Sequence, residues 1–180
     1  MRGAEAVLSF VDLLGTRMVR KDRRAKAYRV PELDLKIRTE RTRREARLLH
    51  KAKLAGVSTP TVYSVDEFSI IMTYLKGRKL GGNARELGAA GKVLASLHNS
   101  GIIHGDFTPY NIVVDKGRLH VIDFGLGFFS SRIEDKADDL ITMLRCIENR
   151  DAFLSGYRKC KDYDAVMRRK SQIEMRARYQ

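Results

Sequence analysis

Residues 104–111 read His-Gly-Asp-Phe-Thr-Pro-Tyr-Asn, and residues 123–125 read Asp-Phe-Gly. Between these stretches lie two short apolar runs rich in β-branched residues, 112–114 and 119–122. Lys116-Gly117 separates the runs, and this arrangement is typical of a β-hairpin. We therefore expect Asn111 to enter one strand and Asp123 to leave the next, which would place both side chains at the same end of the hairpin.

The spacing of these polar residues predicts phosphoryl-transfer chemistry. Asp106, the four residues after it and Asn111 match the H-R-D-x-x-x-x-N catalytic loop of protein kinases, and residues 123–125 match Asp-Phe-Gly. In that scheme Asp106 orients the acceptor hydroxyl, while Asn111 and Asp123 hold Mg²⁺ against the phosphates of ATP. Mn²⁺ could replace Mg²⁺. A plain surface hairpin with solvated polar ends is the alternative, but it does not account for the N-terminal half of the chain.

The N-terminal half supplies a candidate for the phosphate-gripping ion pair. Lys21 closes a short strand-like segment, and Glu45 lies on a helix expected over residues 34–55, before the helix breakers Gly56 and Pro60. A kinase pairs a strand lysine with a helix glutamate, and the lysine then contacts the ATP phosphates. Because this segment contains so many basic residues, the assignment of Lys21 and Glu45 as the pair depends on the presence of the catalytic loop downstream.

These elements predict an α+β, protein-kinase-like, minimal two-lobed fold in one domain, residues 1–180. Its N-lobe, residues 1–75, would carry a five-stranded antiparallel sheet and one main helix, and its C-lobe, residues 76–180, would be helical and reduced. The expected segments are a hairpin over 6–14 and 16–21, a loop over 28–34, strands over 61–65 and 68–75, and helices over 84–100, 134–147 and the last thirty residues. His104 is expected to anchor the catalytic loop, and Asp139 could receive backbone N–H groups of that loop or serve as a helix N-terminal acid.

Five blocks of sequence carry a resemblance to a known family: residues 28–34, 41–46, 104–106, 123–126 and 134–140. Together they resemble the small atypical kinase subunit of the KEOPS complex, also called the p53-related kinase family, from about Gly3 to the C-terminus. The resemblance implies a Mg·ATP-dependent serine/threonine kinase or ATPase. It also implies partnership with the enzyme that makes threonylcarbamoyladenosine in tRNA, the threonylcarbamoyl transferase, and with the other KEOPS subunits.

The resemblance also assigns site residues. Lys21 and Glu45 become the phosphate-gripping pair, and Asp106, Asn111 and Asp123 become the catalytic and metal-binding residues. The reduced phosphate loop of the family corresponds to Gly3, Ala4 and Glu5, followed by Ala6. The adenine-binding hinge corresponds to Met72, Thr73 and Leu75; since Thr73 stands where relatives usually carry an acidic residue, contacts to adenine there must use backbone groups.

The formal net charge of +13 is unevenly distributed. Residues 17–53 hold 15 Lys and Arg against 5 Asp and Glu, and residues 157–180 hold 8 against 3. Such a surface is typical of RNA or phosphate binding, although a solvated helix face or a surface rich in ion pairs would give the same composition. The resemblance favours contact with tRNA through both stretches, while the tail is shorter than the Arg/Lys-Gly-rich ending of many relatives.

The length of the chain limits how it could be regulated. Only 55 residues follow Gly125, no Ala-Pro-Glu triplet follows Asp-Phe-Gly, and Gly105 replaces the arginine that would contact a phosphorylated activation loop. We therefore expect control by partner proteins. Cys146, expected in the core, and Cys160 are interpreted as reduced thiols, and with no secretory signal or membrane-spanning stretch the protein is expected in the cytoplasm.

Two other functions fit parts of the pattern. His-Gly-Asp-x-x-x-x-Asn also occurs in antibiotic and choline kinases, which would make the chain a small-molecule phosphotransferase. Those enzymes carry extra helices around the acceptor, for which this chain has little room. The other hypothesis is an RNA-binding scaffold whose nucleotide site serves assembly of a complex.

Overall fold

The N-lobe is built on an antiparallel sheet of four strands. The computed structural model describes residues 6–176, and within them the sheet comprises β1 (Val7–Leu13), β2 (Thr16–Asp22), β3 (Val62–Val65) and β4 (Ser69–Thr73), in the order β1-β2-β4-β3. The predicted β1–β2 hairpin is confirmed, and its turn uses Leu14 and Gly15 with φ of 52° and 73°. Among residues 6–176 the sheet has four strands and not the expected five, because the strand-like segment that ends at Lys21, residues 18–21, is part of β2 and not a strand of its own.

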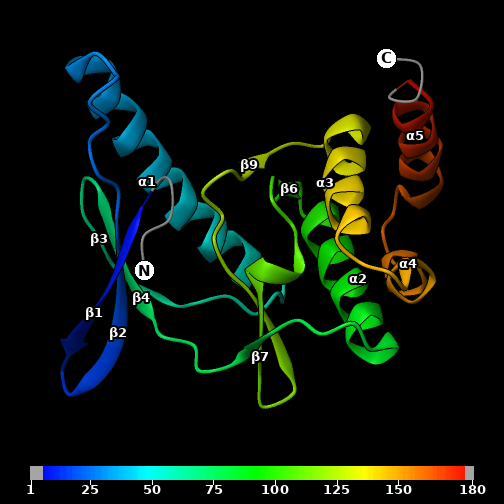
Figure 1. Ribbon diagram of the computed structural model, residues 1–180, viewed down its shortest axis with the longest axis horizontal. Helices are drawn as coiled ribbons and strands as arrows, with labels where there is room; N and C mark the ends of the chain where they lie inside the picture. Colours follow the sequence, from blue (N-terminus) through cyan, green and yellow to red (C-terminus); the bar gives the residue numbers. More distant parts are fainter. Residues whose placement is uncertain (1–5, 177–180) are drawn as a thin grey trace.

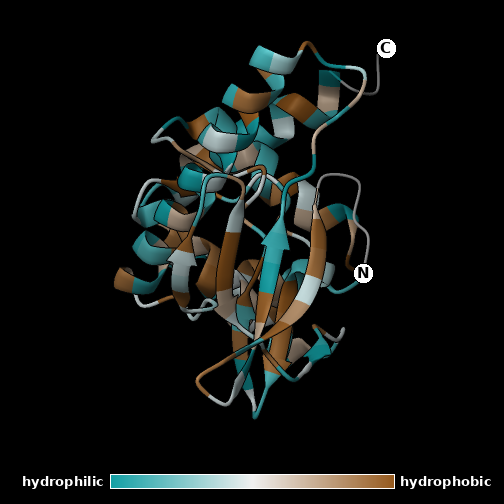
Figure 2. Cartoon of the chain, turned by 90° about the vertical axis from the view of Figure 1, so that its left-hand side faces the viewer, coloured by the Kyte–Doolittle hydropathy of each residue, from teal (hydrophilic) through white to brown (hydrophobic). Residues whose placement is uncertain are grey.

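Side chains alternate across this sheet, so one face carries the residues that point toward the rest of the molecule. Lys21 lies beside Ile70, and Val19 lies beside Met72, in the antiparallel register of β2 and β4. Figure 2 shows the sheet face-on, with a largely hydrophobic β4 next to the hydrophilic C-terminal end of β2. Lys21 is therefore a buried charge in an otherwise apolar row, which requires a partner.

Helix α1 (Pro31–Leu54) runs from beyond the edge of the N-lobe to the centre of the molecule (Figure 1). It begins at Pro31, three residues before the expected start at Asp34, so the predicted loop over 28–34 is wrong in its last four residues. Proline is favoured in the first helical turn because its missing N–H would have no helical partner there. The helix ends before Gly56, whose φ of 79° suits the position after a helix C-cap.

Only part of α1 contributes to the core. Leu48 and Leu49 are fully buried near its C-terminal end, whereas Leu33 and Leu35 in its first turns are exposed. Leu35 therefore does not share the buried face of the helix with Leu48. The first turns project past the sheet (Figure 1), so no layer covers them among residues 6–176.

The C-lobe combines short strand pairs with helices. Residues 74–83 lead through β5 (Arg78–Lys79) to α2 (Ala84–Asn99), whose first turn is capped by the Asn83 side chain. Then follow β6 (Ile102–Ile103), the 3-10 turn η1 (Pro109–Asn111), β7 (Ile112–Asp115), β8 (Arg118–Val121) and β9 (Phe128–Phe129). The chain closes with α3 (Ile133–Arg145), α4 (Arg150–Tyr157) and α5 (Tyr163–Arg176). The β7–β8 hairpin, α2, α3 and the final helix pair confirm the corresponding predictions.

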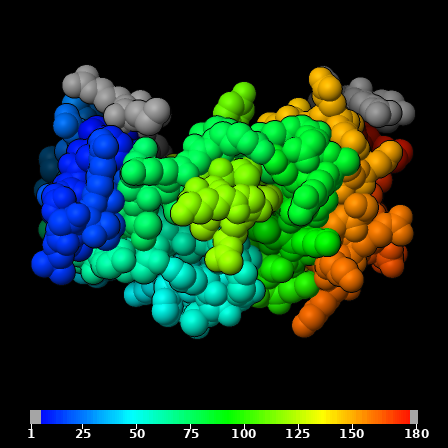
Figure 3. Space-filling view, turned by 90° about the horizontal axis from the view of Figure 1, so that it is seen from below, coloured from blue at the N-terminus to red at the C-terminus, as the bar shows by residue number. Residues whose placement is uncertain are grey.

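The helices pack around a core that supports residues 104–111. Leu94, Phe107 and Phe153 are fully buried members of this core. Seen from below, the β7–β8 hairpin lies on the surface between the β1–β2 end and α4 (Figure 3). Cys160 is buried but Cys146 is exposed, because it lies one residue past the end of α3; its predicted place in the core is wrong. None of the helices formed by residues 6–176 is long and apolar enough to cross a bilayer.

Candidate active site

The loop after β6 is held in place by a buried carboxylate on α3. Asp139 Oδ2 accepts a hydrogen bond from the His104 N–H at 2.7 Å, and Oδ1 accepts one from the Gly105 N–H at 2.9 Å. Hydrogen bonds to a buried carboxylate are among the stronger ones in proteins. Of the two predicted roles for Asp139, the structure shows the one in which it binds the loop.

His104 joins this loop to the Asp-Phe-Gly segment. Its Nδ1 accepts from the Asp106 N–H at 3.3 Å, so the ring proton is assigned to Nε2, which donates to the Ile122 carbonyl at 3.1 Å. The ring also packs against Phe107 and Phe124. The anchoring role predicted for His104 is confirmed.

Gly105 takes a conformation that other residues rarely adopt. Its φ is 79°, and a Cβ at this position would stand 2.5 Å from the Leu126 carbonyl oxygen. The loop therefore passes directly against the backbone that follows Asp-Phe-Gly, which only a glycine allows.

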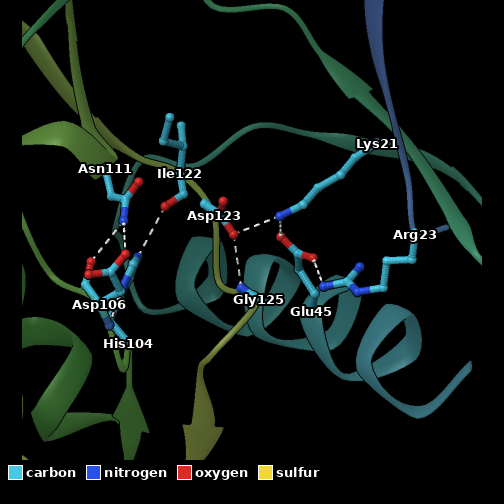
Figure 4. Close-up of polar contacts among 9 residues, drawn as sticks. All are labelled: Lys21, Arg23, Glu45, His104, Asp106, Asn111, Ile122, Asp123 and Gly125. Carbon is cyan, nitrogen blue, oxygen red and sulfur yellow. Dashed lines mark hydrogen bonds and ion pairs between the residues drawn. The ribbon is translucent and has the colours of Figure 1, made fainter. Parts of the chain in front are cut away.

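Asp106 and Asn111 contact each other at the mouth of the loop. The Asn111 Nδ2 group donates to Asp106 Oδ2 at 2.8 Å and to the Asp106 carbonyl at 2.9 Å (Figure 4). Because the amide nitrogen is used in this way, the Asn111 Oδ1 atom is turned away from Asp106 and is available as an oxygen ligand.

Asp123 lies where the hairpin places it. The Ile122 N–H donates to the Asn111 carbonyl at 2.9 Å, so the end of β8 and the start of β7 are adjacent, as predicted. Asp123 has a φ of 61°, which is uncommon for a residue with a side chain and recurs at functional sites. Its Oδ1 accepts from the Gly125 N–H at 3.1 Å, and 52% of its side chain is exposed.

Lys21 connects the N-lobe with this hairpin. Its Nζ lies 2.7 Å from Glu45 Oε1 and 2.6 Å from Asp123 Oδ1 (Figure 4). Partial burial works against ionisation of Asp123, but the charge and hydrogen bond of Lys21 outweigh it and hold the pKa of this carboxyl below its usual value. The lysine–glutamate pair predicted from the sequence is therefore formed, between β2 and α1.

A second cation shares Glu45, and sequence reasoning missed it. Arg23 Nη2 contacts Glu45 Oε2 at 2.6 Å, so the two oxygens of one carboxylate bind two different cations. All three side chains are more than nine-tenths buried. The Lys-x-Arg spacing of residues 21 and 23 is the signal that could have identified Arg23, because residues two apart in extended chain face the same side.

The remaining predicted residues are less closely tied to this centre. Met72 and Thr73 end β4, and the Thr73 N–H donates to the Thr61 carbonyl at 2.9 Å, so it is not free for an adenine contact. Leu75 follows the strand, half-buried. Gly3, Ala4 and Glu5 lie outside the described residues.

The oxygens at this centre fit Mg²⁺. Asn111 Oδ1 and the second oxygen of Asp123 are the available hard ligands, which suits an ion that keeps several waters and binds through one or two protein groups plus phosphates. Among residues 6–176 there is no cluster of three or more His, Cys, Asp or Glu side chains that could hold a metal alone.

Comparison with known proteins agrees with this geometry. The family model for the RIO domain matches residues 8–126, and the model for the phosphotransferase enzyme family matches residues 98–168. In overall fold the chain is similar to the Rio2 kinase–ADP/Mg²⁺–phosphoaspartate complex from Chaetomium thermophilum, with a TM-score of 0.69, 15% identity, and coverage of 100% of this chain and 70% of that one. The fold is therefore protein-kinase-like.

Relatives of known name cover the chain almost completely. It is 36% identical to a probable serine/threonine-protein kinase BUD32 homolog of Archaeoglobus fulgidus, over 98% of this chain and 94% of that protein. It is 35% identical to the KEOPS complex subunit Bud32 of Pyrococcus abyssi, over 91% and 84%. It is also 38% identical to a probable bifunctional tRNA threonylcarbamoyladenosine biosynthesis protein of Methanothermobacter thermautotrophicus, of which it spans 36%. The chain spans only about a third of the length of this protein and of other bifunctional relatives that it matches. From the RIO-domain match and the two relatives of similar length, we conclude that the chain belongs to the RIO-domain family of protein kinases, among the Bud32 homologues.

Proposed function

We propose that this chain, as one minimal kinase domain with an N-lobe to residue 75 and a C-lobe from residue 76, transfers the terminal phosphoryl group of Mg·ATP to a protein or to water. The observation that carries the proposal is the Lys21 ammonium, which contacts both Glu45 and Asp123 within 2.7 Å. These contacts join strand β2, helix α1 and the end of the β7–β8 hairpin at one seam. Such a seam positions phosphates and stabilises the charge that develops during transfer.

Each side chain has a distinct part in this proposal. Lys21, oriented by Glu45, would bind the ATP phosphates. Asn111 Oδ1 and Asp123 would hold Mg²⁺, or Mn²⁺ in its place, which supplies charge neutralisation at the phosphates. Asp106, held by the Asn111 amide, would orient the acceptor hydroxyl or water and accept its proton.

The adenine site is proposed between the lobes. Met72 faces the same side of the sheet as Lys21, which suits packing against a base. Because the Thr73 N–H is bound within the sheet, backbone contact to adenine would fall to the Thr73 carbonyl and to Leu75. Gly3, Ala4 and Glu5 are proposed to close over the phosphates.

The described part of the chain offers little surface on which a peptide acceptor could bind. Only residues 126–132 separate Gly125 from α3, and part of that segment is the strand β9 paired with β6. A peptide acceptor in larger kinases lies on an extended segment at this place, which here has no room. We therefore propose that activity depends on partner proteins, and that the working reaction includes ATP hydrolysis.

The relatives indicate the setting. One is named as a KEOPS complex subunit and another as a tRNA threonylcarbamoyladenosine biosynthesis protein. We infer that this chain is the kinase subunit of a KEOPS complex in the cytoplasm, next to a threonylcarbamoyl transferase, and supports that tRNA modification. The basic stretches 17–53 and 157–180 would contact the tRNA.

A small-molecule phosphotransferase is the less favoured candidate. The phosphotransferase family model covers residues 98–168, the catalytic loop and the helices around it, which both kinds of enzyme share. The near-full-length relatives carry kinase or KEOPS names. Labelled ATP offered with a protein acceptor, an aminoglycoside and choline separates the two, because transfer to a small molecule alone would reverse the ranking.

The test of the proposed function is Mg-dependent ATP hydrolysis by the Asp123→Ala protein. We expect turnover to disappear while binding of tRNA, which uses other surfaces, is retained. Asp115→Asn at the far end of the same hairpin serves as the control and should hydrolyse ATP normally. Turnover that survives in Asp123→Ala would show that the metal is held elsewhere.

Adding tRNA and the partner transferase, singly and together, then distinguishes a complex-bound ATPase from a free-standing kinase. Stimulation by both supports the KEOPS assignment, and indifference to both contradicts it. Tight tRNA binding with no turnover under any condition would favour the scaffold hypothesis.

A further inference from the structure

A hollow lined almost entirely by cationic side chains lies on the N-lobe, next to the Lys21–Glu45 pair, which it reaches through Arg23. It is formed where residues 23–29 run beside the first half of α1 (Figure 1), and we call it the cationic hollow. Its basic members are Arg23, Arg24, Lys26, Arg29, Arg38 and Arg41.

Two carboxylates of the described residues, Asp34 and Glu45, contact the basic members of the hollow. Asp34 accepts from Arg38 Nε at 2.6 Å, from Arg29 Nη1 at 3.5 Å and from the Lys26 N–H at 3.3 Å. Glu45 is bound to Arg23 but is shared with Lys21. Within residues 6–176, the four arginines Arg23, Arg24, Arg29 and Arg38 thus share two carboxylates, one of which also binds Lys21, so the field at this spot is positive.

Arg23 is the decisive member, because its hydrogen-bonding capacity is incomplete. Its side chain is 3% exposed, and among residues 6–176 only the Nη2 group has a hydrogen-bond partner, Glu45. The Nε and Nη1 groups are buried without any hydrogen-bond partner among the described residues. A buried donor left unpaired costs free energy, so these groups indicate a ligand that supplies acceptors.

The size of the hollow suits part of a phosphate group. Its volume is about 10 Å³, room for one water-sized group, so a single oxygen could enter while the other oxygens stay at the mouth. Guanidinium groups match phosphate oxygens in geometry and charge better than they match halide ions. The ring of arginines around the mouth would contact those outer oxygens.

We propose that the cationic hollow is a binding site for a phosphate group, separate from the proposed nucleotide site. The two sites lie on opposite sides of one carboxylate, since Arg23 contacts Glu45 Oε2 and Lys21 contacts Oε1 (Figure 4). A free phosphate anion and a polynucleotide backbone both present this group to the hollow. The proposal does not require the chain to turn over ATP.

The experiment follows the Nε–H resonance of Arg23 by NMR while inorganic phosphate is added at constant ionic strength, with chloride as the reference salt. We expect a saturable shift with phosphate and none with chloride. The double variant Arg24→Gln, Arg29→Gln should bind phosphate at least about tenfold more weakly, which is the loss expected when charge-assisted hydrogen bonds are removed. Arg43→Gln with Arg44→Gln removes the same charge from exposed positions of α1 outside the hollow and should change the affinity less than about twofold.

Two further arms identify the source and isolate the site. A short single-stranded RNA that gives the same shift at lower concentration would identify a polynucleotide backbone, and a response to the free anion alone would identify a free phosphate. Lys21→Met, which should end ATP turnover, is expected to leave the Arg23 shift unchanged, so failure of the proposed function would not be mistaken for failure of this site. The proposal is overturned if chloride shifts Arg23 equally, if both double variants lose phosphate to the same extent, or if Lys21→Met abolishes the response.

Discussion

Replacing Gly105 by alanine tests whether the catalytic loop depends on its close approach to the backbone after Asp-Phe-Gly. The chain offers a matched control in Gly117, at the tip of the β7–β8 hairpin. Gly105 and Gly117 have nearly the same φ, 79° and 76°. A Cβ at Gly105 would lie 2.5 Å from the Leu126 carbonyl oxygen, whereas a Cβ at Gly117 would meet nothing within 4 Å.

The expected magnitudes follow from this difference. An alanine held in the left-handed region costs about 1–2 kcal/mol, and both substitutions carry this cost. Forcing a methyl group against backbone that cannot move away adds about 1–3 kcal/mol at Gly105 only. We therefore expect Gly117→Ala to lower the free energy of unfolding by about 1–2 kcal/mol and Gly105→Ala by about 2–5 kcal/mol.

Urea unfolding followed by circular dichroism measures both values, since the chain contains no tryptophan for a fluorescence assay. ATP turnover at low urea should fall in Gly105→Ala alone, because relief of the contact would move the Gly105 N–H away from Asp139. Equal losses of stability in the two variants would refute the reasoning, as the contact with Leu126 would then contribute nothing. The same geometry explains why the arginine of larger kinases cannot stand at this position.

Three other substitutions test separate features of the fold. Gly91→Ala should destabilise the protein by about 3 kcal/mol or more in thermal unfolding, since a Cβ at this position would stand 2.0 Å from the Phe153 carbonyl oxygen in α4. Gly88→Ala is the control one turn earlier on α2, and it should be neutral or stabilising because its Cβ would have its nearest contact at 3.4 Å. Glu86→Gln should make the protein less sensitive to acid, because hydrogen bonds from Arg78 outweigh burial and lower the pKa of Glu86 to about 2. The contribution of Glu86 to the free energy of unfolding is therefore complete above about pH 4.5 and is lost as the pH falls toward 2, so an unchanged acid-unfolding profile would contradict this. His98→Gln should lower the free energy of unfolding most at acidic pH, because, although burial opposes the charged form, Asp139 raises the pKa of His98 above 6.5. This stabilisation is complete below about pH 6.5 and is lost as the pH rises through the raised pKa, so a difference in urea midpoints that does not change with pH would contradict the prediction.

The parts of the site that depend on local chemistry could be predicted from the sequence. The Lys116-Gly117 turn takes φ of 48° and 76°, as a tight hairpin requires, and the register that follows places Asn111 beside the end of β8. Once the hairpin is specified, the convergence of Asn111 and Asp123 follows from the pairing of neighbouring residues. No long-range information was needed for this half of the site.

The parts that depend on tertiary burial could not be predicted in the same way. In residues 17–53, 15 of the 37 positions are Lys or Arg, so composition alone does not distinguish the buried Arg23 from the exposed Arg24. The pairing of Asp34 with Arg38, four residues apart on α1, is a local signal of the helix, but the predicted loop over 28–34 extends to Asp34 and misses the first turn. Cys146 was placed in the core from the apolar run before it, whereas the end of α3 one residue earlier turns it outward.

The two halves of the site are organised by the same device, a buried carboxylate whose two oxygens bind different groups. In the N-lobe, Glu45 divides its oxygens between Lys21 and Arg23. In the C-lobe, Asp139 binds the Gly105 N–H with one oxygen and the His104 N–H with the other, which His98 also approaches at 3.3 Å. Each carboxylate belongs to a helix, so displacement of α1 would disturb both N-lobe cations together, and displacement of α3 would disturb the whole catalytic loop.

In the proposed function, this arrangement would position the reacting groups without an extended segment between Asp-Phe-Gly and α3. Residues 126–132 run directly from Asp-Phe-Gly into α3, so the helix that anchors the catalytic loop is also the end of the segment that larger kinases use for control. A partner that binds α3 or the exposed first turns of α1 would therefore act on the reacting groups through one carboxylate each. We propose that control by docking needs no phosphorylated loop here, because Glu45 of α1 binds Lys21 and Asp139 of α3 binds the backbone of the catalytic loop.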